Sequence, residues 1–269
     1  MNRFTVIEKK VGETPFSALE VFRAGDEKLS ELPLTYAGRL DPMASGKLLI
    51  LIGDECKNRK KYDDLDKEYE FEILFGFKTD TGDVLGLAQA DNKNQAINEK
   101  DLVRVAQTFL GKKRFPYPAF SSKTVLGKPL FHHAIENNLG QIEIPKADIE
   151  IYNLKLSSIY KISGKLLIEN IEKKISLLDP GPETDKVGNG FRKEEILEKW
   201  KSFGDVSAQE FTVAKFKIIT SSGSYIRTIA PLIAEKLGTF GLAYSIHRAK
   251  IGHYKSLIKN FGFWRRTFV

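Results

Sequence analysis

Apolar and polar residues alternate most clearly over residues 68–77, where aromatic and aliphatic side chains occupy every second position and glutamates lie between the first of them. This period of two predicts a strand with one buried face. The aliphatic run at 46–53 is bounded by glycines and predicts a buried strand, although a buried helix also fits so short a run. Further strand-like runs occur at 3–8 and 213–220, with several more, broken by Gly164, at 149–178.

Apolar residues at helical spacing predict helices at 15–23, 97–111, 129–139, 192–200 and 227–238. Asn98 is a suitable N-cap for the second of these helices, and Gly111 is a suitable end for it. Because a proline lacks the N–H donor that a helix interior requires, Pro231 should interrupt the last helix.

Three stretches predict loops. Residues 114–120 contain two prolines, so they should form a stiff loop rather than a central strand. Residues 178–191 are rich in Gly, Pro and Asp and predict a linker or loop, and residues 221–224 predict a turn. Many strands mixed with helices predict an α+β fold with a mixed, largely antiparallel central sheet flanked by helices and loops.

The 269-residue chain has a formal net charge of +7. This charge favours an anionic partner, most commonly nucleic acid, although a lysine-rich solvated surface also explains it. A single cysteine permits no intramolecular disulfide and suits a reducing compartment. Because no apolar run of signal-peptide or membrane-span length occurs, we expect a cytoplasmic protein. The four histidines and Cys56 show no metal-ligand spacing, so no metal site is expected.

The densest group of unusual residues is Y-A-G-R-L-D-P-M-A-S-G at 36–46. It places the carboxylate of Asp41 in a glycine-bounded loop just before a predicted strand. Pro42 restricts the backbone of Asp41 to extended or turn conformations, so the loop can present this side chain rigidly toward a cleft. An ordinary Asp-Pro turn is the alternative interpretation.

A second group, S-G-S-Y-I-R-T at 222–228, places Arg227 at the start of a predicted helix. The helix dipole disfavours a cation in the first turn. A carboxylate or phosphate partner would explain the arginine, and an exposed arginine without a partner is the alternative.

Residues 38–48, G-R-L-D-P-M-A-S-G-K-L, resemble the catalytic motif of the TruB-type pseudouridine synthases. Other stretches resemble further motifs of that family: Lys9 with Gly12 and Thr14, K-E-Y at 67–69 followed by G-F-K-T-D-T-G-D at 76–83 and Gly86, P-A-F-S-S-K at 118–123 with Val125, Gly127, Lys128 and Leu130, and S-Y-I-R-T at 224–228 with E-K-L-G at 235–238. The five motifs follow the family's order over residues 5–253. The resemblance implies a pseudouridine synthase fold.

The chain also departs from the family's pattern. Five residues differ from the usual ones: Tyr36, Arg39, Lys10, Pro15 and Ser222. The first two stand where bacterial members usually carry His and Thr. Residues 160–205 form a longer segment than the family implies, and the chain ends about where the C-terminal PUA domain of many members begins. We therefore expect a single catalytic domain over residues 1–269 and no PUA domain.

The resemblance implies that the protein converts a uridine in the T loop of tRNA, at position 55, to pseudouridine. This reaction breaks the bond between C1′ and N1, turns the base and joins C1′ to C5, so it requires no redox cofactor, and we expect none. It requires a carboxylate near the sugar, a group that takes the C5 proton, and a pocket for an extruded base.

The resemblance also implies roles for three residues. Asp41 acts at the sugar, as a nucleophile or as a base at the 2′ position, and Arg227 pairs with Asp41 and keeps it ionised. Tyr69 stacks on the base and is the candidate for C5 deprotonation, although the ordinary pKa of a tyrosine, about 10, makes it a weak base. Further residues are expected to contact the substrate: Tyr36, Gly38, Arg39, Lys123, Lys128, Tyr225, Ile246 (an apolar wall) and Arg248.

Other functions compete with this one. A non-catalytic tRNA-binding or tRNA-folding protein could keep the same scaffold, a synthase could act on another RNA, and a glycosidase-like enzyme on another nucleoside shares the C1′ chemistry. Asp41, Tyr69 and Arg227 together favour the enzyme, since binding alone does not require that trio. The expected partner is the T arm of tRNA, bound by a monomer with no obligatory protein partner. The aromatic residues of the C-terminal stretch, Phe261, Phe263 and Trp264, are expected to lie on the core.

Overall fold

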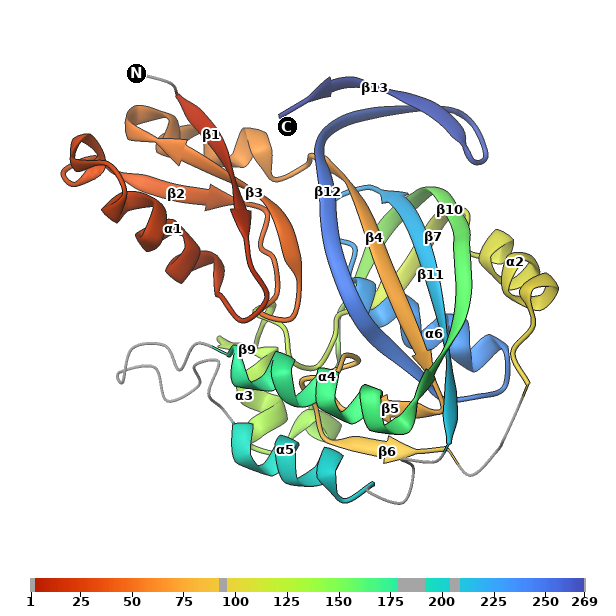
Figure 1. The fold of residues 1–269 in the computed structure, drawn as a ribbon. Coiled ribbons are helices and arrows are strands. Elements are labelled where there is room, and N and C mark those ends of the chain that lie inside the picture. Colours follow the sequence, from red (N-terminus) through yellow and green to blue (C-terminus); the bar gives the residue numbers. More distant parts are fainter. Residues whose placement is uncertain (1–2, 92–95, 179–191, 204–208, 269) are drawn as a thin grey trace.

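The computed structural model of the protein describes residues 3–91, 96–178, 192–203 and 209–268. Nine strands of this part form one sheet: β1 (Phe4–Lys9), β2 (Leu34–Ala37), β3 (Ser45–Ile52), β4 (Asp66–Phe75), β7 (Gly111–Pro116), β10 (Lys146–Ser163), β11 (Glu210–Thr220), β12 (Gly241–Ile258) and β13 (Phe261–Thr267). Their order is β1-β3-β12-β4-β11-β10-β7, with β2 beside β3 and β13 beside β12 (Figure 1). The pairs are antiparallel except β12 with β3. The predicted α+β fold with a mixed, largely antiparallel sheet is confirmed.

The central strand β4 shows why the sequence pattern works. Its alternating aromatic and aliphatic side chains, from Tyr69 to Phe75, are buried. Its two neighbours, β11 and β12, both come from the C-terminal part of the chain, so that Tyr69 lies opposite Ile218 on one side and Arg248 on the other. The sheet therefore brings residues from both ends of the sequence to one place.

Helices and short ribbons complete the fold. The helices are α1 (Pro15–Ala24), α2 (Glu99–Thr108), α3 (Leu130–Ile135), α4 (Gly164–Ser176), α5 (Lys193–Lys201) and α6 (Ile226–Lys236), with 3₁₀ turns η1 (Glu27–Leu29), η2 (Gly53–Tyr62) and η3 (Leu139–Gln141). The ribbons are β5 (Phe77–Thr79) with β6 (Ala88–Ala90), and β8 (Thr124–Val125) with β9 (Lys128–Pro129). Asn98 caps α2 as predicted, accepting a hydrogen bond from the Asp101 amide. None of the described helices is long and apolar enough to cross a membrane.

Three predictions of secondary structure are wrong. Residues 114–116 of the loop predicted at 114–120 belong to the strand β7, because an edge strand, which in the described part of the chain pairs with β10 alone, tolerates a terminal proline. Residues 164–176 form α4 rather than a broken strand, since apolar side chains spaced by four residues, Leu167, Ile171 and Ile175, are buried on one side of it. Helix α6 runs through Pro231 without interruption. Most of the predicted linker, residues 179–191, lies outside the described residues.

The C-terminal hairpin also differs from expectation. Phe261 and Phe263 are 61% and 50% exposed, because β13 lies outside β12 and turns alternate side chains to solvent. Only Trp264 faces inward, where its ring lies 5.3 Å from that of Tyr254 and its Nε1 donates to Glu68.

Three clusters of buried residues hold the described elements together, and the third, around Leu49, Leu51 and Ile251, joins β3 to β12. The largest one joins β4, β11 and β12 to the helices α2, α4, α5 and α6. The second one joins α1 to β3 through Ala18, Leu19, Leu48 and Ile50. Figure 1 shows α4 and α5 together at one end of the sheet, near β6, and the α1–β3 unit to one side of β12 and β4.

Candidate active site

A cleft of about 1080 Å³ lies between the α1–β3 unit and the part of the protein built around β4 and β12, and residues of both line it. One wall comes from α1 and from the loop that carries Asp41, and the other comes from β4, β12, the start of α6 and the loop after β7. The predicted site residues among the lining ones are Tyr36, Gly38, Arg39, Asp41, Tyr69, Tyr225, Arg227, Ile246 and Arg248. The fold therefore brings together most of the residues that the sequence motifs contribute.

Asp41 lies in the turn between β2 and β3, and hydrogen bonds fix that turn at several points. The Asp41 carbonyl accepts from the Ala44 amide at 3.0 Å, and the Pro42 carbonyl accepts from the Gly12 amide at 2.9 Å. Met43 and Ala44 are buried beneath it. The carboxylate keeps one third of its surface exposed, so the loop presents it to the cleft on a rigid base.

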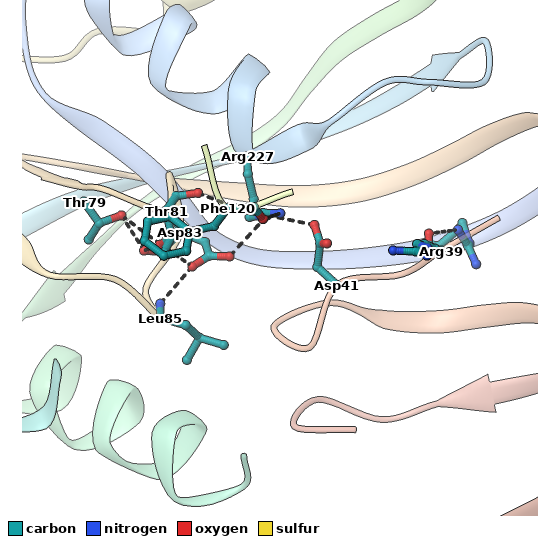
Figure 2. A network of polar contacts seen from close by, with 9 residues as sticks. Arg39, Asp41, Thr79, Thr81, Asp83, Leu85, Phe120 and Arg227 are labelled. Atoms are coloured by element: carbon teal, nitrogen blue, oxygen red, sulfur yellow. Dashed lines mark hydrogen bonds and ion pairs between the residues drawn. The ribbon is translucent and has the colours of Figure 1, made fainter. Parts of the chain in front are cut away.

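Arg227 binds this carboxylate from the first turn of α6. Its Nε donates to Asp41 Oδ2 at 2.7 Å, Nη1 donates to the Thr81 carbonyl at 3.0 Å and Nη2 to the Phe120 carbonyl at 3.1 Å (Figure 2). Burial of the guanidinium disfavours its charge, but Asp41 and Asp83 outweigh that effect and raise its pKa above the usual range. The carboxylate partner predicted for this first-turn arginine is present, so Asp41 has a fixed, permanently charged neighbour.

Asp83 is a site residue that the sequence reasoning missed. Its Oδ2 lies 3.5 Å from Arg227 Nε, while Oδ1 accepts from Thr81 Oγ1 at 2.8 Å and from the Leu85 amide at 2.9 Å. Burial raises the pKa of the Asp83 carboxyl to about 6, against the opposing effects of Arg227 and Thr81. Its place in the T-D-T-G-D stretch was the available signal, although an acid in such a turn can also serve the turn itself, as the bonds to Thr81 and Leu85 show.

Gly82 allows the Asp83 loop to approach α6 closely. Pro231 has no N–H, so the Arg227 carbonyl four residues earlier has no intrahelical donor. A Cβ at Gly82 would lie 2.2 Å from that carbonyl oxygen, and the backbone of Gly82 has a φ of +77°. Glycine is therefore required at this point, and the close approach places Asp83 against Arg227.

Tyr69 and Ile246 form part of the cleft wall from the adjacent strands β4 and β12, and both are nearly fully buried. Tyr225 lines the same cleft one residue before α6, with its ring 5.7 Å from that of Tyr117. Burial, and then the Asp41 carboxylate, raise the pKa of Tyr225 to about 12. Two aromatic side chains and one aliphatic side chain thus line the same cleft as the Asp41 carboxylate, which suits a flat base.

The position of Arg248 corrects its predicted role. Its side chain is fully buried, and it donates to the carbonyls of Lys47, Arg39 and Gly38 at 2.7, 2.9 and 3.1 Å. These bonds use the guanidinium to brace the backbone on both sides of Asp41. Arg248 therefore supports the loop that carries Asp41, and its buried charge does not face solvent, where RNA would lie.

The remaining predicted contacts lie at the rim. Arg39 is exposed, and Tyr36 has the Arg59 guanidinium 5.8 Å from its ring centroid. Lys123 and Lys128 do not line the cleft itself but are exposed on the loop beside it, where Lys128 pairs with Glu136 at 3.1 Å. Within the described ranges, no three His, Cys, Asp or Glu side chains come together as metal ligands would.

Lys9 fixes the N-terminal loop beneath Asp41. Its side chain is fully buried, and Nζ donates to the carbonyls of Lys10 and Glu13 at 2.8 Å each. Burial lowers the pKa of this ammonium from 10.5 to about 8, with Glu13 and Asp41 opposing the shift.

The titration of Lys9 should appear in the stability of the protein. Between pH 8 and 10.5 the folded state binds fewer protons at Lys9 than the unfolded state, so this group adds stability as the pH rises. From pH 7.5 to 9.5 we expect a gain of about 2 kcal/mol from Lys9. Urea denaturation at the two pH values should therefore show a smaller gain for Lys9→Met than for the wild type. Lys10→Met, at the exposed neighbour, is the control; equal gains in all three proteins would contradict the assignment.

The family model and two sequence relatives that match this chain all describe pseudouridine synthases. A family model described as TruB family pseudouridylate synthase (N terminal domain) matches residues 28–172. The tRNA pseudouridine synthase B of Caldicellulosiruptor saccharolyticus is 27% identical over 252 residues, which are 94% of this chain and 68% of that protein. The tRNA pseudouridine synthase 4 of Saccharomyces cerevisiae is 36% identical over 132 residues, 49% of this chain and 33% of that protein.

A crystal structure of a Cbf5-Nop10-Gar1 complex has the same fold, with a TM-score of 0.55 at 14% identity. The match covers 93% of this chain and 49% of that chain. The match thus spans about half the length of this structural relative and 68% and 33% of the lengths of the two sequence relatives.

Proposed function

Because the chain belongs to the TruB family of pseudouridylate synthases, we propose that it converts a uridine in the T loop of tRNA to pseudouridine. The observation that carries this proposal is the carboxylate of Asp41, held at 2.7 Å by a buried arginine in a cleft that Tyr69 lines. The relatives named as tRNA pseudouridine synthases support tRNA as the substrate class.

The proposed chemistry needs few groups. The C1′–N1 bond of the uridine breaks, the base turns within the cleft and C1′ joins C5; the proton on C5 is then released, and N1 carries a proton from solvent in the product. Asp41 acts at the sugar, and Arg227 keeps its carboxylate ionised and aimed. Tyr69 and Ile246 enclose the uracil ring. The Tyr69 hydroxyl is the candidate group for accepting the proton from C5. No electrons enter or leave the substrate.

The positive side chains around the mouth of the cleft are suited to bind RNA phosphates outside the modified uridine. Arg39, Lys123 and Lys128 are exposed around the cleft, where they can contact phosphates and make binding weaken steeply with salt. We propose that the chain acts as one catalytic domain, supported by the nine-stranded sheet that contains both β1 and β13. We also propose that it is a cytoplasmic monomer; its single cysteine supports a reducing compartment.

Tritium release from C5-tritiated uridine in a tRNA transcript tests this function directly, because the C5 hydrogen must leave when C1′ joins C5 and the assay supplies no other group to replace it. Release with the wild-type tRNA, and none with a transcript lacking the T arm, is the expected pair of results. Binding without release would favour a non-catalytic tRNA-binding protein instead, and release from the transcript lacking the T arm would point to another uridine.

An isolated T-arm stem-loop should be modified nearly as well as whole tRNA. The cleft and the basic loop beside it are the surfaces that we assign to recognition, and both would face the T loop. We expect the two rates to agree within roughly tenfold, the effect of about 1.4 kcal/mol of lost contacts. Parallel tritium assays on the two RNAs measure the ratio; an inert stem-loop would show that recognition extends to another part of the tRNA.

A further inference from the structure

Helix α5 contacts the loop between Thr79 and Leu87 at both of its ends. Arg192, just before the helix, donates through Nη1 to Asp80 Oδ2 at 2.6 Å. Near its other end, the fully buried Trp200 donates through Nε1 to the Val84 carbonyl at 3.0 Å. The loop held in this way is the one that carries Asp83.

Arg192 also lies against Phe120. Its guanidinium carbon is 4.7 Å from the centroid of the Phe120 ring, a cation–π distance. The carbonyl of the same phenylalanine accepts from Arg227 Nη2. Phe120 lines the cleft, and it is therefore held by its backbone from the catalytic side and by its ring from α5.

The backbone conformation of Arg192 and the burial of its side chain show that the guanidinium is held in one place. The φ of Arg192 is +56°, the left-handed region that side chains rarely adopt. Its side chain is only 16% exposed, and that of Asp80 is 34% exposed. The guanidinium is thus turned inward toward Asp80 and Phe120, and two further apolar residues of this region, Leu178 and Ile196, line the cleft next to it.

We propose that Arg192 is a positioning residue for tRNA binding: it fixes the Phe120 ring and, through it, residues 120–122, which line the cleft. This proposal rests on the proposed function. Arg192 contacts Asp80 and Phe120, whereas Asp41 is held by Arg227, which has its own bonds to Thr81 and Asp83. Removal of Arg192 should therefore weaken RNA binding and leave the chemical step unchanged.

Kinetics of Arg192→Leu on tRNA should show this split. We expect KM to rise roughly tenfold, the size of one partly shielded cation–π contact, with kcat changed by less than about twofold. Arg192→Lys keeps the charge near Asp80 but lacks the planar group that covers a ring, so it should restore part of the affinity. Arg192→Gly keeps the preferred backbone conformation and should match Arg192→Leu without loss of thermal stability.

Arg104→Leu is the matched control. It breaks an equally short ion pair, Arg104 with Asp101 at 2.6 Å, and removes the same charge from an exposed site on α2. In proteins that also carry Asp41→Asn, the affinity for fluorescent tRNA can be measured without turnover. We expect about tenfold weaker binding for Arg192→Leu than for Arg104→Leu, with the same dependence on salt.

Three results would overturn the proposal. Equal affinity of Arg192→Leu and Arg104→Leu would show that the Phe120 contact is irrelevant to binding. The logarithm of the binding constant falls with the logarithm of the salt concentration, and the slope counts phosphate contacts. A slope shallower by about one contact in Arg192→Leu would show that Arg192 touches RNA directly. A fall in kcat as large as that in kcat/KM would place its effect on Asp83 and the chemical step. Failure of the proposed function itself is distinct, since the wild type would then release no tritium.

Discussion

Asparagine in place of Asp41 should leave tRNA binding largely intact and reduce pseudouridine formation by at least about a thousandfold. The amide oxygen can still accept the hydrogen bond that Arg227 Nε now donates at 2.7 Å. Arg227 also keeps its second carboxylate, Asp83, at 3.5 Å. The local structure should therefore survive, and only the negative charge needed beside the sugar is lost. Tritium release measures turnover, and fluorescence anisotropy with labelled tRNA measures affinity.

Asp54→Asn is the control for this variant. It makes the same chemical change on the surface, where Asp54 is 93% exposed and pairs only with Lys57. Its turnover should stay within about twofold of the wild type, as expected for an exposed pair. If Asp41→Asn also turned over at a rate close to that of the wild type, Asp41 could have no part in the reaction.

Phenylalanine in place of Tyr69 should reduce turnover by roughly a hundredfold and change the affinity for tRNA little. The ring stays in its buried position on β4 and lines the same cleft. Stacking of a base on an aromatic ring, worth about 1–3 kcal/mol, survives this substitution. The hydroxyl is the group removed, and with it the candidate acceptor of the C5 proton. Single-turnover kinetics at saturating enzyme isolates this step from binding.

Tyr160→Phe provides the comparison for Tyr69→Phe. This tyrosine lies on β10, outside the cleft lining, and its hydroxyl donates to Glu72 at 3.1 Å. Single-turnover rates should match the wild type for Tyr160→Phe and fall for Tyr69→Phe. Equal rates in all three proteins would take Tyr69 out of the proton transfer and leave it only a stacking role.

Local pattern predicted the strands and helices whose residues alternate or repeat within one element. The alternation around Phe71 is an example, since one face of β4 is buried over its whole length. The same reasoning failed for β7, where position at the edge of the sheet decides whether a proline is tolerated. Whether a strand lies at the edge or in the centre of a sheet depends on its pairing with strands far away in the sequence. A short window of sequence does not contain that information.

The site was predicted by resemblance more than by pattern. Asp41 and Arg227 are 186 residues apart in the chain, so no spacing rule connects them. Arg248 illustrates the limit: its sequence position suggests a solvent-exposed cation, whereas the folded protein buries it against three carbonyls. Asp83 was missed for the same reason, because its significance comes from Arg227, a residue on another element.

The long separation between β4 and its partners determines when the enzyme can first work during its synthesis. β4 leaves the ribosome early, but both of its edges wait for residues 210–258, which form β11 and β12. Through that interval the aromatic and aliphatic face of β4 is uncovered and the strand has two unpaired edges, a combination that favours aggregation. Because Arg227 and Arg248 arrive in the same late stretch, a partly synthesised chain has an Asp41 loop but no means to hold its carboxylate in place.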